Sequence, residues 1–271
     1  MGERREGPPA ANAPEKANNI FGSWADGVSD EIAFWRQWLS TKGLDWPEDY
    51  AKRLDPDVPL QASVQQALAS DLSDVRVLDA GAGPLTPLGK RISGRSLSLI
   101  ASDALAPAYD VLLAEHGIVP VVRTVFAPNE ALLCFFERSS FDIVHCSNSL
   151  DHSFDPVSAI RQMLAVTKVG GTVILGHYVN EAERENYQGL HQFNFHARDG
   201  HFFVASRTVE VCVDDALGIA CECAHSDDGD WVQSKIVKRE EYSDRSLLEM
   251  TSNHTRRIWT EFVSYLLSLR G

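Results

Sequence analysis

The sequence is poor in positive charge. It has 25 Lys and Arg residues against 38 Asp and Glu residues, a formal net charge of −13, and no cluster of five or more cations. Nucleic acids and anionic membrane surfaces attract proteins through cationic patches. We therefore expect no nucleic-acid partner.

Long apolar runs are also absent. The chain has no stretch of 18 apolar residues, and no apolar segment typical of a signal peptide follows Met1. A helix that crosses a bilayer needs about 20 such residues, and a secretory signal needs an apolar core of roughly 7–15. We expect a cytoplasmic protein without a membrane span, and the sequence leaves its oligomeric state open.

Cysteine is scarce and lacks the usual metal-binding spacing. The five cysteines form no Cys-x-x-Cys pair, and their number is odd. Without a secretion signal, we expect reduced and buried thiols. Cys221 and Cys223 alternate in a strand-like stretch, so both side chains should share one face. We interpret them as core-facing residues and not as metal ligands.

Short apolar runs alternate with helical segments in the middle of the chain. The expected strands cover residues 75–78, 97–101, 119–125, 141–145 and 172–176. Helices are expected after Thr86 and over residues 107–116, 130–137 and 156–167, the last with Asp155 as its N-cap. Such alternation is typical of βαβ units with right-handed crossovers. The predicted fold class is α/β, with a Rossmann-like parallel sheet.

The segments on either side of this core differ in composition. Residues 1–19 are rich in Gly, Pro, Ala, Asn and charges, which predicts a disordered tail. Residues 20–70 predict a helical N-terminal cap, in which one helix starts at Ser29 and Asp30 and a second covers residues 61–72. The core is expected over residues 71–180 and a substrate-side segment over residues 181–271. Within that segment we expect strands over 207–213, 218–223 and 231–238 and a closing helix over 246–269.

A glycine turn follows the first core strand. Asp79-Ala80-Gly81-Ala82-Gly83 succeeds the apolar run, and Thr86-Pro87 offers an N-cap and a first-turn proline. Glycine adopts backbone angles closed to other residues and lets a ligand approach the main chain. A strand, a glycine turn and a helix at the carboxyl edge of a parallel sheet form a site for nucleotide-like ligands.

The residues around this turn select the class of nucleotide. Position six of the dinucleotide fingerprint is Thr86 instead of glycine, and no Gly-Lys-Ser/Thr follows as in a phosphate-binding loop. Asp79 would repel a pyrophosphate, whereas it suits the ammonium group of a sulfonium cofactor. Asp103 ends the second strand and is placed to accept ribose hydroxyls; the alternative is that it caps the following helix.

With these residues the chain resembles the class I S-adenosylmethionine-dependent methyltransferases, in particular their type-11 group. The resemblance covers about residues 75–177. It rests on Leu78-Asp79-Ala80-Gly81-Ala82-Gly83, on Asp103, on Phe141-Asp142-Ile143-Val144 followed by Leu150-Asp151-His152 and Asp155-Pro156, and on Val169-Gly170-Gly171-Thr172-Val173-Ile174-Leu175.

The resemblance implies S-adenosylmethionine as the cofactor and a set of residues that hold it. The glycine turn would hold the methionine part, the acid after the second strand the ribose, and the loop after the fourth strand would border the methyl group. The implied binding residues are Asp79, Gly81, Ala82, Gly83, Asp103, Ala104, Leu105, Asn129, Glu130, Asn148 and Leu150. Leu85 replaces the third family glycine, and Pro128 stands where an acid often contacts adenine, so adenine recognition is assigned to the region of Asn129 and Glu130.

Methyl transfer to a hydroxyl group also needs a base, and histidine suits that role near neutral pH. Three histidines follow strand ends or lie in the polar segment after the fifth strand: His152, His177 and His191. Asp151 could orient His152 or bind the substrate. Asp151 with Asp155 could instead hold a divalent ion, but we expect no bound metal.

These observations support three hypotheses on function. The leading one is an O-methyltransferase for a sugar, a glycan or another hydroxylated small molecule, because residues 176–181 and 187–195 are dense in amides, histidines and aromatic rings. The second is N- or C-methylation of a metabolite. The third is a non-catalytic cofactor-binding protein, which the intact Asp79, Gly81, Gly83 and Asp103 argue against.

Overall fold

A seven-stranded sheet forms the centre of the protein. The computed structural model describes residues 20–68 and 74–252, so the tail expected over residues 1–19 lies outside the described residues. The strand order is β11-β12-β7-β6-β1-β4-β5. The bounds are β1 (Arg76–Ala80), β4 (Ser98–Asp103), β5 (Thr124–Phe126), β6 (Phe141–Ser147), β7 (Thr167–Tyr178), β11 (Cys221–Asp227) and β12 (Trp231–Lys238).

Six of these strands run in one direction, and β12 runs against them. The pairs among β7, β6, β1, β4 and β5 are parallel, whereas β12 is antiparallel to both β7 and β11. Helix α4 (Ala106–Glu115) directly follows β4, and helix α5 (Pro156–Val166) directly precedes β7. The predicted α/β class with a Rossmann-like sheet is therefore confirmed.

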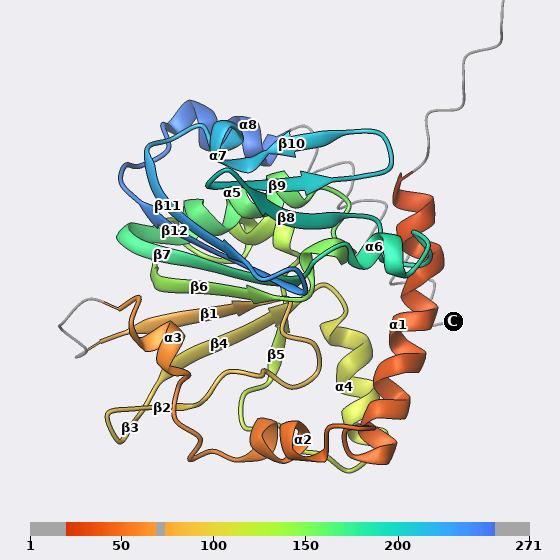
Figure 1. The fold of residues 1–271 in the computed structure, drawn as a ribbon. Coiled ribbons are helices and arrows are strands. Elements are labelled where there is room, and N and C mark those ends of the chain that lie inside the picture. The colour runs from red at the N-terminus through yellow and green to blue at the C-terminus, as the bar shows by residue number, and fades with distance from the viewer. Residues whose placement is uncertain (1–19, 69–73, 253–271) are drawn as a thin grey trace, which may run out of the picture.

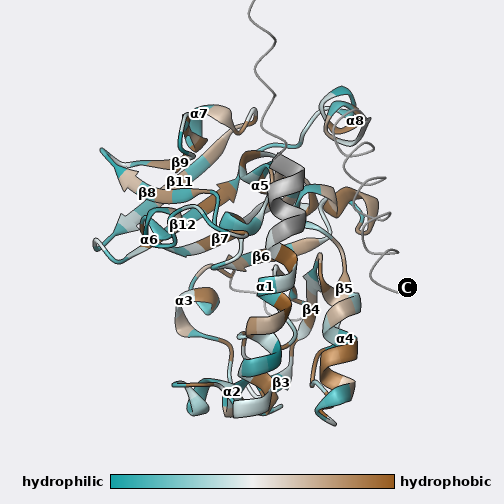
Figure 2. Ribbon diagram, turned by 90° about the vertical axis from the view of Figure 1, so that its right-hand side faces the viewer, coloured by the Kyte–Doolittle hydropathy of each residue, from teal (hydrophilic) through white to brown (hydrophobic). Residues whose placement is uncertain are grey.

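The sheet order reverses at β1. The chain moves from β1 outward through β4 to β5, then returns to β6 on the opposite side of β1. Loops that leave β1 and β6 therefore diverge at the carboxyl edge of the sheet, which creates a crevice where ligands bind in open α/β sheets. Figure 1 shows α1 (Ile20–Thr41) standing across this edge, and Figure 2 shows the same helix in front of the strands.

The helix expected after Thr86 is absent from the structure. The chain forms a loop and then a small hairpin of β2 (Arg91–Ile92) and β3 (Arg95–Ser96) before it enters β4. Pro84, Pro87 and Gly89 fall within six residues and disfavour a helix. The Thr86 hydroxyl donates to Asp79 and accepts the Leu88 N–H, so it organises a loop and does not cap a helix.

The N-terminal segment covers the sheet face left by the missing helix. Leu60 and Val64 are buried in one cluster with Val77, Leu88 and Ile143. Backbone hydrogen bonds tie the segment to the loop, from the Leu60 N–H to the Arg91 carbonyl and from the Lys90 N–H to the Val58 carbonyl. This segment therefore belongs to the core of the fold as well as to the predicted helical cap.

The remaining N-terminal elements differ from the expected bounds. Helix α1 runs unbroken through Ser29 and Asp30, so these residues do not start a helix. The helix expected over residues 61–72 is the short α3 (Ala62–Gln65), and residues 69–73 lie outside the described part. Between α1 and α3, Pro47 begins α2 (Pro47–Leu54), a helix that the sequence reading did not include.

Two elements of the core are shorter than expected. Strand β5 begins at Thr124, because Pro120 cannot donate a backbone hydrogen bond in the preceding run. The helix expected over residues 130–137 is the 3-10 helix η1 (Asn129–Cys134), which is kinked at Ala131. By contrast, Asp155 caps α5 as predicted, since its side chain accepts the Ser158 N–H at 2.9 Å.

A second, three-stranded sheet follows the core. It consists of β10 (Glu210–Cys212), β9 (His201–Ala205) and β8 (Asn194–Arg198), preceded by α6 (Glu181–Arg184) and followed by α7 (Val213–Ala216). The β8–β9 hairpin was not expected, although Asp199-Gly200 is a strong hairpin-turn signal and both residues have positive φ.

The last elements follow the expectations more closely. The strand over residues 231–238 is β12, as predicted. The strand expected over 218–223 is β11, which is displaced to Cys221–Asp227, and the strand expected over 207–213 is the shorter β10, because α7 begins at Val213. The closing helix begins as α8 (Asp244–Ser252), and its expected remainder lies outside the described residues. None of the helices in the described ranges has the length and apolar character needed to cross a membrane.

Candidate active site

A cavity of about 810 Å³ opens at the carboxyl edge of the sheet, where the strand order reverses. Its walls come from the turn after β1, the end of β4, the loops after β5 and β6, and helices α1 and α2. Ten of the predicted cofactor-binding residues line it: Asp79, Gly81, Ala82, Gly83, Asp103, Ala104, Leu105, Asn129, Glu130 and Asn148. Leu150 does not; it is fully buried in the core beneath the η2 turn (Leu150–His152).

The glycine turn has the conformation that the sequence implied. Gly81 and Gly83 have φ values of +73° and +65°, and the N–H groups of Gly81 and Ala82 both donate to the Ser102 carbonyl. A Cβ atom on Gly81 would collide with the Ser149 side chain, and one on Gly83 would lie 2.8 Å from the Trp35 ring. Only glycine is compatible with both the backbone angles and these approaches.

Asp79 is buried at the base of this turn. One carboxylate oxygen lies 2.8 Å from Nδ1 of His145, and the other accepts the Thr86 hydroxyl at 2.5 Å. His145, which lies on β6, is therefore the partner of the acid that the sequence singled out. The pair holds a carboxylate against the cavity wall.

Asp103 fixes the turn to the end of β4. Its two oxygens accept the N–H of Gly83 at 3.0 Å and the N–H of Leu105 at 2.8 Å. Burial raises the pKa of Asp103 to about 6 despite these hydrogen bonds. Asp103 is not the N-cap residue of α4, which is Leu105, but its bond to the Leu105 N–H also ties it to the start of that helix. A carboxylate accepts up to about four hydrogen bonds, so its oxygens retain capacity for ligand hydroxyls.

Asn129 and Glu130 differ in what occupies their side chains. The buried Oδ1 of Asn129 has no hydrogen-bond partner within the described structure. Glu130 instead accepts the N–H groups of Phe154 and Asp155 at 3.0 and 3.4 Å, and burial raises its pKa to about 7. Glu130 thus fixes the loop before α5, whereas Asn129 presents an unsatisfied acceptor.

Residues of the N-terminal helices complete the wall, and the sequence reading missed them as site residues; among them are Glu31, Trp35 and Arg53. Trp35 donates to Glu31 at 2.6 Å and lies over Gly83. Arg53 donates to the Leu85 carbonyl at 2.7 Å and packs over the rings of Trp35 and Trp38. The aromatic run that includes Trp35 and Trp38 was visible in the sequence, but helical spacing could not say what its rings would cover.

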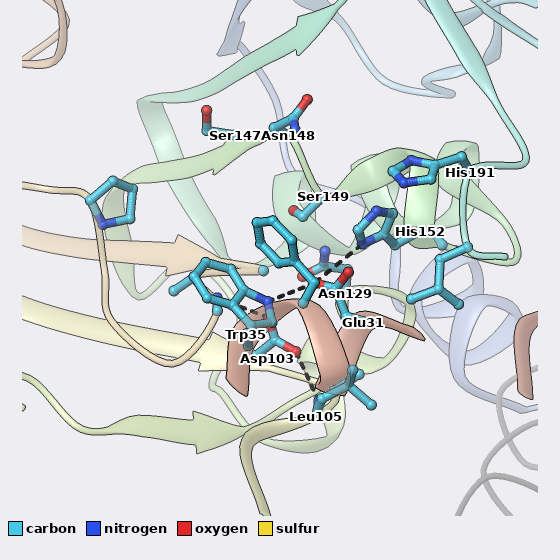
Figure 3. Close-up of a pocket in the computed structure, with 18 of the residues that line it drawn as sticks. Glu31, Trp35, Asp103, Leu105, Asn129, Ser147, Asn148, Ser149, His152 and His191 are labelled. Carbon is cyan, nitrogen blue, oxygen red and sulfur yellow. Dashed lines mark hydrogen bonds and ion pairs between the residues drawn. The ribbon is translucent and has the colours of Figure 1, made fainter. Parts of the chain in front are cut away.

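Two of the three candidate histidines meet at the other end of the cavity. His152 and His191 both line it, and their ring centroids are 4.8 Å apart. Nδ1 of His191 lies 2.7 Å from Oδ2 of Asp151, which is also 3.4 Å from Nε2 of His152. Figure 3 shows the two histidines side by side, away from Trp35 and Asp103.

The buried Asp151 controls the charge of this end. Burial lowers the pKa of His191, but the hydrogen bond and negative charge of Asp151 outweigh that effect and raise it to about 9. Burial in turn raises the pKa of Asp151, and the two histidines outweigh this and lower it. Asp151 and His191 therefore form an ion pair at neutral pH.

The third candidate, His177, lies outside the cavity. It is 1% exposed, stacks on Phe195 with centroids 4.4 Å apart, and neither ring nitrogen has a hydrogen-bond partner within the described structure. Burial lowers its pKa to about 4. Its place on β7 beneath the site gives it no contact with a ligand in the cavity, so its prediction as a base is not supported by the geometry.

The amides expected to bind hydroxyl groups are used within their own segment. Gln192 donates to the carbonyls of Tyr187 and Gly189, and Asn194 donates to the Tyr187 hydroxyl and accepts the Glu183 N–H. The members of residues 176–195 that do reach the cavity are Tyr178, Glu181, Glu185, Leu190 and His191.

The comparisons with known proteins agree with this geometry. Residues 78–175 match the family model described as methyltransferase domain. A ubiquinone biosynthesis O-methyltransferase of Bordetella avium is 33% identical over 137 residues, which cover 47% of this chain and 52% of that protein. The protein of the same name from Bordetella pertussis is 31% identical over 162 residues, which cover 56% of this chain and 63% of that protein. The chain thus matches less than two thirds of the length of these relatives.

Residues 78–175 form a methyltransferase domain of the class I S-adenosylmethionine-dependent type. The predicted family and its cofactor, S-adenosylmethionine, are confirmed. Among solved structures, a methyltransferase from Thermotoga maritima is 14% identical in sequence to this chain. The alignment covers 82% of this chain and 100% of the Thermotoga chain, with a TM-score of 0.46.

The cavity of this methyltransferase domain fits the family cofactor. Gly81 and Gly83 leave space that a Cβ atom would fill, and the unpartnered Asn129 Oδ1 offers an acceptor for an amino group. Asp79 and Asp103 place carboxylates where an ammonium group and ribose hydroxyls would need them. These assignments of single residues remain predictions.

Metal binding is a separate question at the histidine end. Donor atoms of Asp151, His152 and His191 lie within 4.8 Å of one another, which is a distance range that a divalent ion could bridge after small movements. The acid pair weighed from the sequence differs, because Asp155 caps α5 with its carboxylate. The expectation of no bound metal stays a prediction.

Proposed function

We propose that this protein is an O-methyltransferase that acts on a hydroxylated small molecule, such as a sugar or another alcohol or phenol. The observation that carries the proposal is the Asp151–His191 pair, 2.7 Å apart, in the cavity that also contains the predicted cofactor-binding residues. The Bordetella relatives support the choice of oxygen, since their name gives O-methylation as their activity.

The proposed catalytic base is His191. In the neutral form of His191, the Nδ1–H group donates a hydrogen bond to Asp151, which orients the ring and leaves Nε2 to accept a proton from the acceptor hydroxyl. S-adenosylmethionine, when bound, supplies the methyl group. The lining of the cavity would have to hold the acceptor oxygen in line with the sulfur–methyl bond that breaks, and such positioning supplies much of the rate.

The lining residues restrict the acceptor. Tyr178 and Trp231 form an aromatic pair with centroids 5.1 Å apart at the same end as His191. Glu181 and Glu185 add carboxylates there, and burial followed by the charge of Asp151 raises the pKa of Glu181 to about 7. Rings and acids together favour a neutral, hydroxyl-bearing ring compound over an anionic one.

Methyl transfer from radiolabelled S-adenosylmethionine would test the proposal. The full chain is incubated with matched acceptors that differ only in carrying a hydroxyl or an amino group, and mass spectrometry locates the added methyl. We expect label on oxygen, and roughly 10²–10⁴-fold slower transfer by His191→Gln. His196→Gln is the matched control, because His196 also faces an acid, Glu210, but lies outside the cavity. Label on nitrogen alone, or undiminished transfer by His191→Gln, would contradict the proposal.

A further inference from the structure

A second cluster of metal-ligating side chains lies outside the cavity, where the small sheet meets the edge of the large one. It consists of two groups that share Asp214: one with His201 and Cys212, the other with Cys223 and His225. Within each group the donor atoms lie within 4.8 Å of one another. None of the five residues lines the cavity described above.

The fold brings these residues together from distant places in the sequence. Alternation along β11 places Cys223 and His225 on one face of the large sheet's edge strand, as we expected for Cys221 and Cys223. Cys212 ends β10 in the small sheet, and α7 begins directly after it with Asp214 as its second residue. Asp214 contacts Phe202 on β9 and His225 on β11. Asp214 therefore stands between the two sheets.

Asp214 is already the centre of a set of hydrogen bonds. One oxygen accepts the Phe202 N–H at 2.9 Å, and the other lies 2.9 Å from Nε2 of His225. The Cys223 thiol also bonds to this carboxylate. The Cys223 thiol and the His225 imidazole N–H thus both direct a proton at the Asp214 carboxylate. A metal ion could take the place of these protons.

His225 has the surroundings typical of a metal-ligating histidine. Its side chain is 1% exposed, and its other nitrogen, Nδ1, lies 2.9 Å from the hydroxyl of Ser234 on β12. Such a partner on the second nitrogen fixes the orientation of the ring and selects the tautomer that binds a metal. The ring also stacks on Phe202, with centroids 5.7 Å apart, which limits its rotation.

We propose that Asp214, Cys223 and His225 bind a zinc-class divalent ion, with the Cys212 thiol as the fourth ligand. Thiolate, imidazole and carboxylate together are the donor set of tetrahedral zinc sites, and the thiols disfavour magnesium or calcium. Zinc bonds of about 2.0–2.3 Å separate neighbouring ligand atoms by roughly 3.3–3.8 Å. Among Asp214, Cys223 and His225 the observed spacing of up to 4.8 Å needs only a small contraction. Cys212 shares only Asp214 with that group, so its thiol would have to move toward the ion.

The proton balance of binding follows from these contacts. Each thiol, Cys212 and Cys223, gives its proton to the solvent as it binds the ion. The proton on Nε2 of His225 is replaced by the metal, and Nδ1 gains a proton that the Ser234 oxygen can accept as a hydrogen bond. The ion would join the small sheet to the edge strand of the large one and stabilise the native state by mass action.

Cobalt substitution gives a readout specific to this site. The full chain is stripped with a chelator, desalted and titrated with Co²⁺, then with Zn²⁺. We expect one equivalent of Co²⁺ to produce a thiolate-to-cobalt charge-transfer band, zinc to abolish it, and zinc to raise the melting temperature. The cluster of Asp151, His152 and His191 contains no cysteine, so an ion bound there would give no such band.

Variants decide whether the named ligands are responsible. Cys223→Ser should abolish the charge-transfer band or weaken zinc binding by at least roughly 100-fold, and Cys212→Ser should reduce the band. Cys221→Ser is the matched control, because Cys221 lies on the same strand face but in neither group. Circular dichroism establishes that each variant is folded. A folded Cys223→Ser protein with an unchanged band, or a wild-type protein without one, would overturn the proposal.

Discussion

The Asp151–His191 pair makes a quantitative prediction about pH. Asp151→Asn keeps the shape of the side chain but removes the negative charge that raises the pKa of His191 to about 9. At pH 7, two units below that value, about 1% of His191 is the neutral base. In the wild type, kcat/KM should therefore rise about tenfold per pH unit from pH 7 and level off above about 9.

The variant should behave differently because burial is then opposed only by the weaker effects of the Glu181 and Glu185 charges. Without the hydrogen bond and charge of Asp151, the pKa of His191 should fall. The inflection in kcat/KM should therefore move to lower pH, and the plateau should drop roughly 10²–10⁴-fold because the ring loses its orienting partner. The assay is initial-rate methyl transfer between pH 6 and 10 with saturating cofactor.

Stability offers a second measurement on the same pair. Because the folded-state pKa of His191 lies above its unfolded value, the pair stabilises the fold fully below about pH 6.5, and this contribution is lost as the pH rises through about 9. The contribution of Asp151 depends on pH in the opposite direction. Because its pKa is lowered in the folded state, it stabilises the fold above about pH 4, and this contribution is lost as the pH falls further. The melting temperature of wild type should fall between pH 6.5 and 9 more than that of Asp151→Asn. An inflection near pH 9 in both proteins, or in neither, would refute the reasoning.

Three further predictions concern the cofactor end and the core. Because Asp103 has a pKa of about 6, calorimetry should find S-adenosylmethionine binding weaker at pH 5 than at pH 7, and Asp103→Asn should lose this dependence. Gly83→Ala, with φ at +65° and its Cβ 2.8 Å from Trp35, should lower the free energy of unfolding by about 1–2 kcal/mol and weaken cofactor binding; unchanged binding would contradict the proposed close approach. Leu60→Ala should cost about 2–5 kcal/mol in urea unfolding, whereas the 87% exposed Val119 should tolerate alanine within about 0.5 kcal/mol; equal losses would show that residues 58–68 are not part of the core.

Much of the fold could be predicted because its signals are local. The apolar runs that became β1, β6 and β12, the Asp155 cap and the glycine turn each depend on a few neighbouring residues. The helix expected after Thr86 failed for a non-local reason. The sheet face that such a helix would cover is occupied by Leu60 and its neighbours, which are separated from the loop by more than twenty residues.

The sequence by itself determined the family, the cofactor and the edge of the sheet where the cavity lies, because the spacing of Asp79, Gly81, Gly83 and Asp103 encodes one strand-turn arrangement. Tertiary structure alone decided which histidine carries a pKa shifted upward. His177 and His191 are alike as sequence features. Among the described residues His177 is buried with no hydrogen-bond partner for either ring nitrogen, whereas His191 lies 2.7 Å from a carboxylate forty residues away. Burial and charge act through space, so only the folded chain assigns these roles.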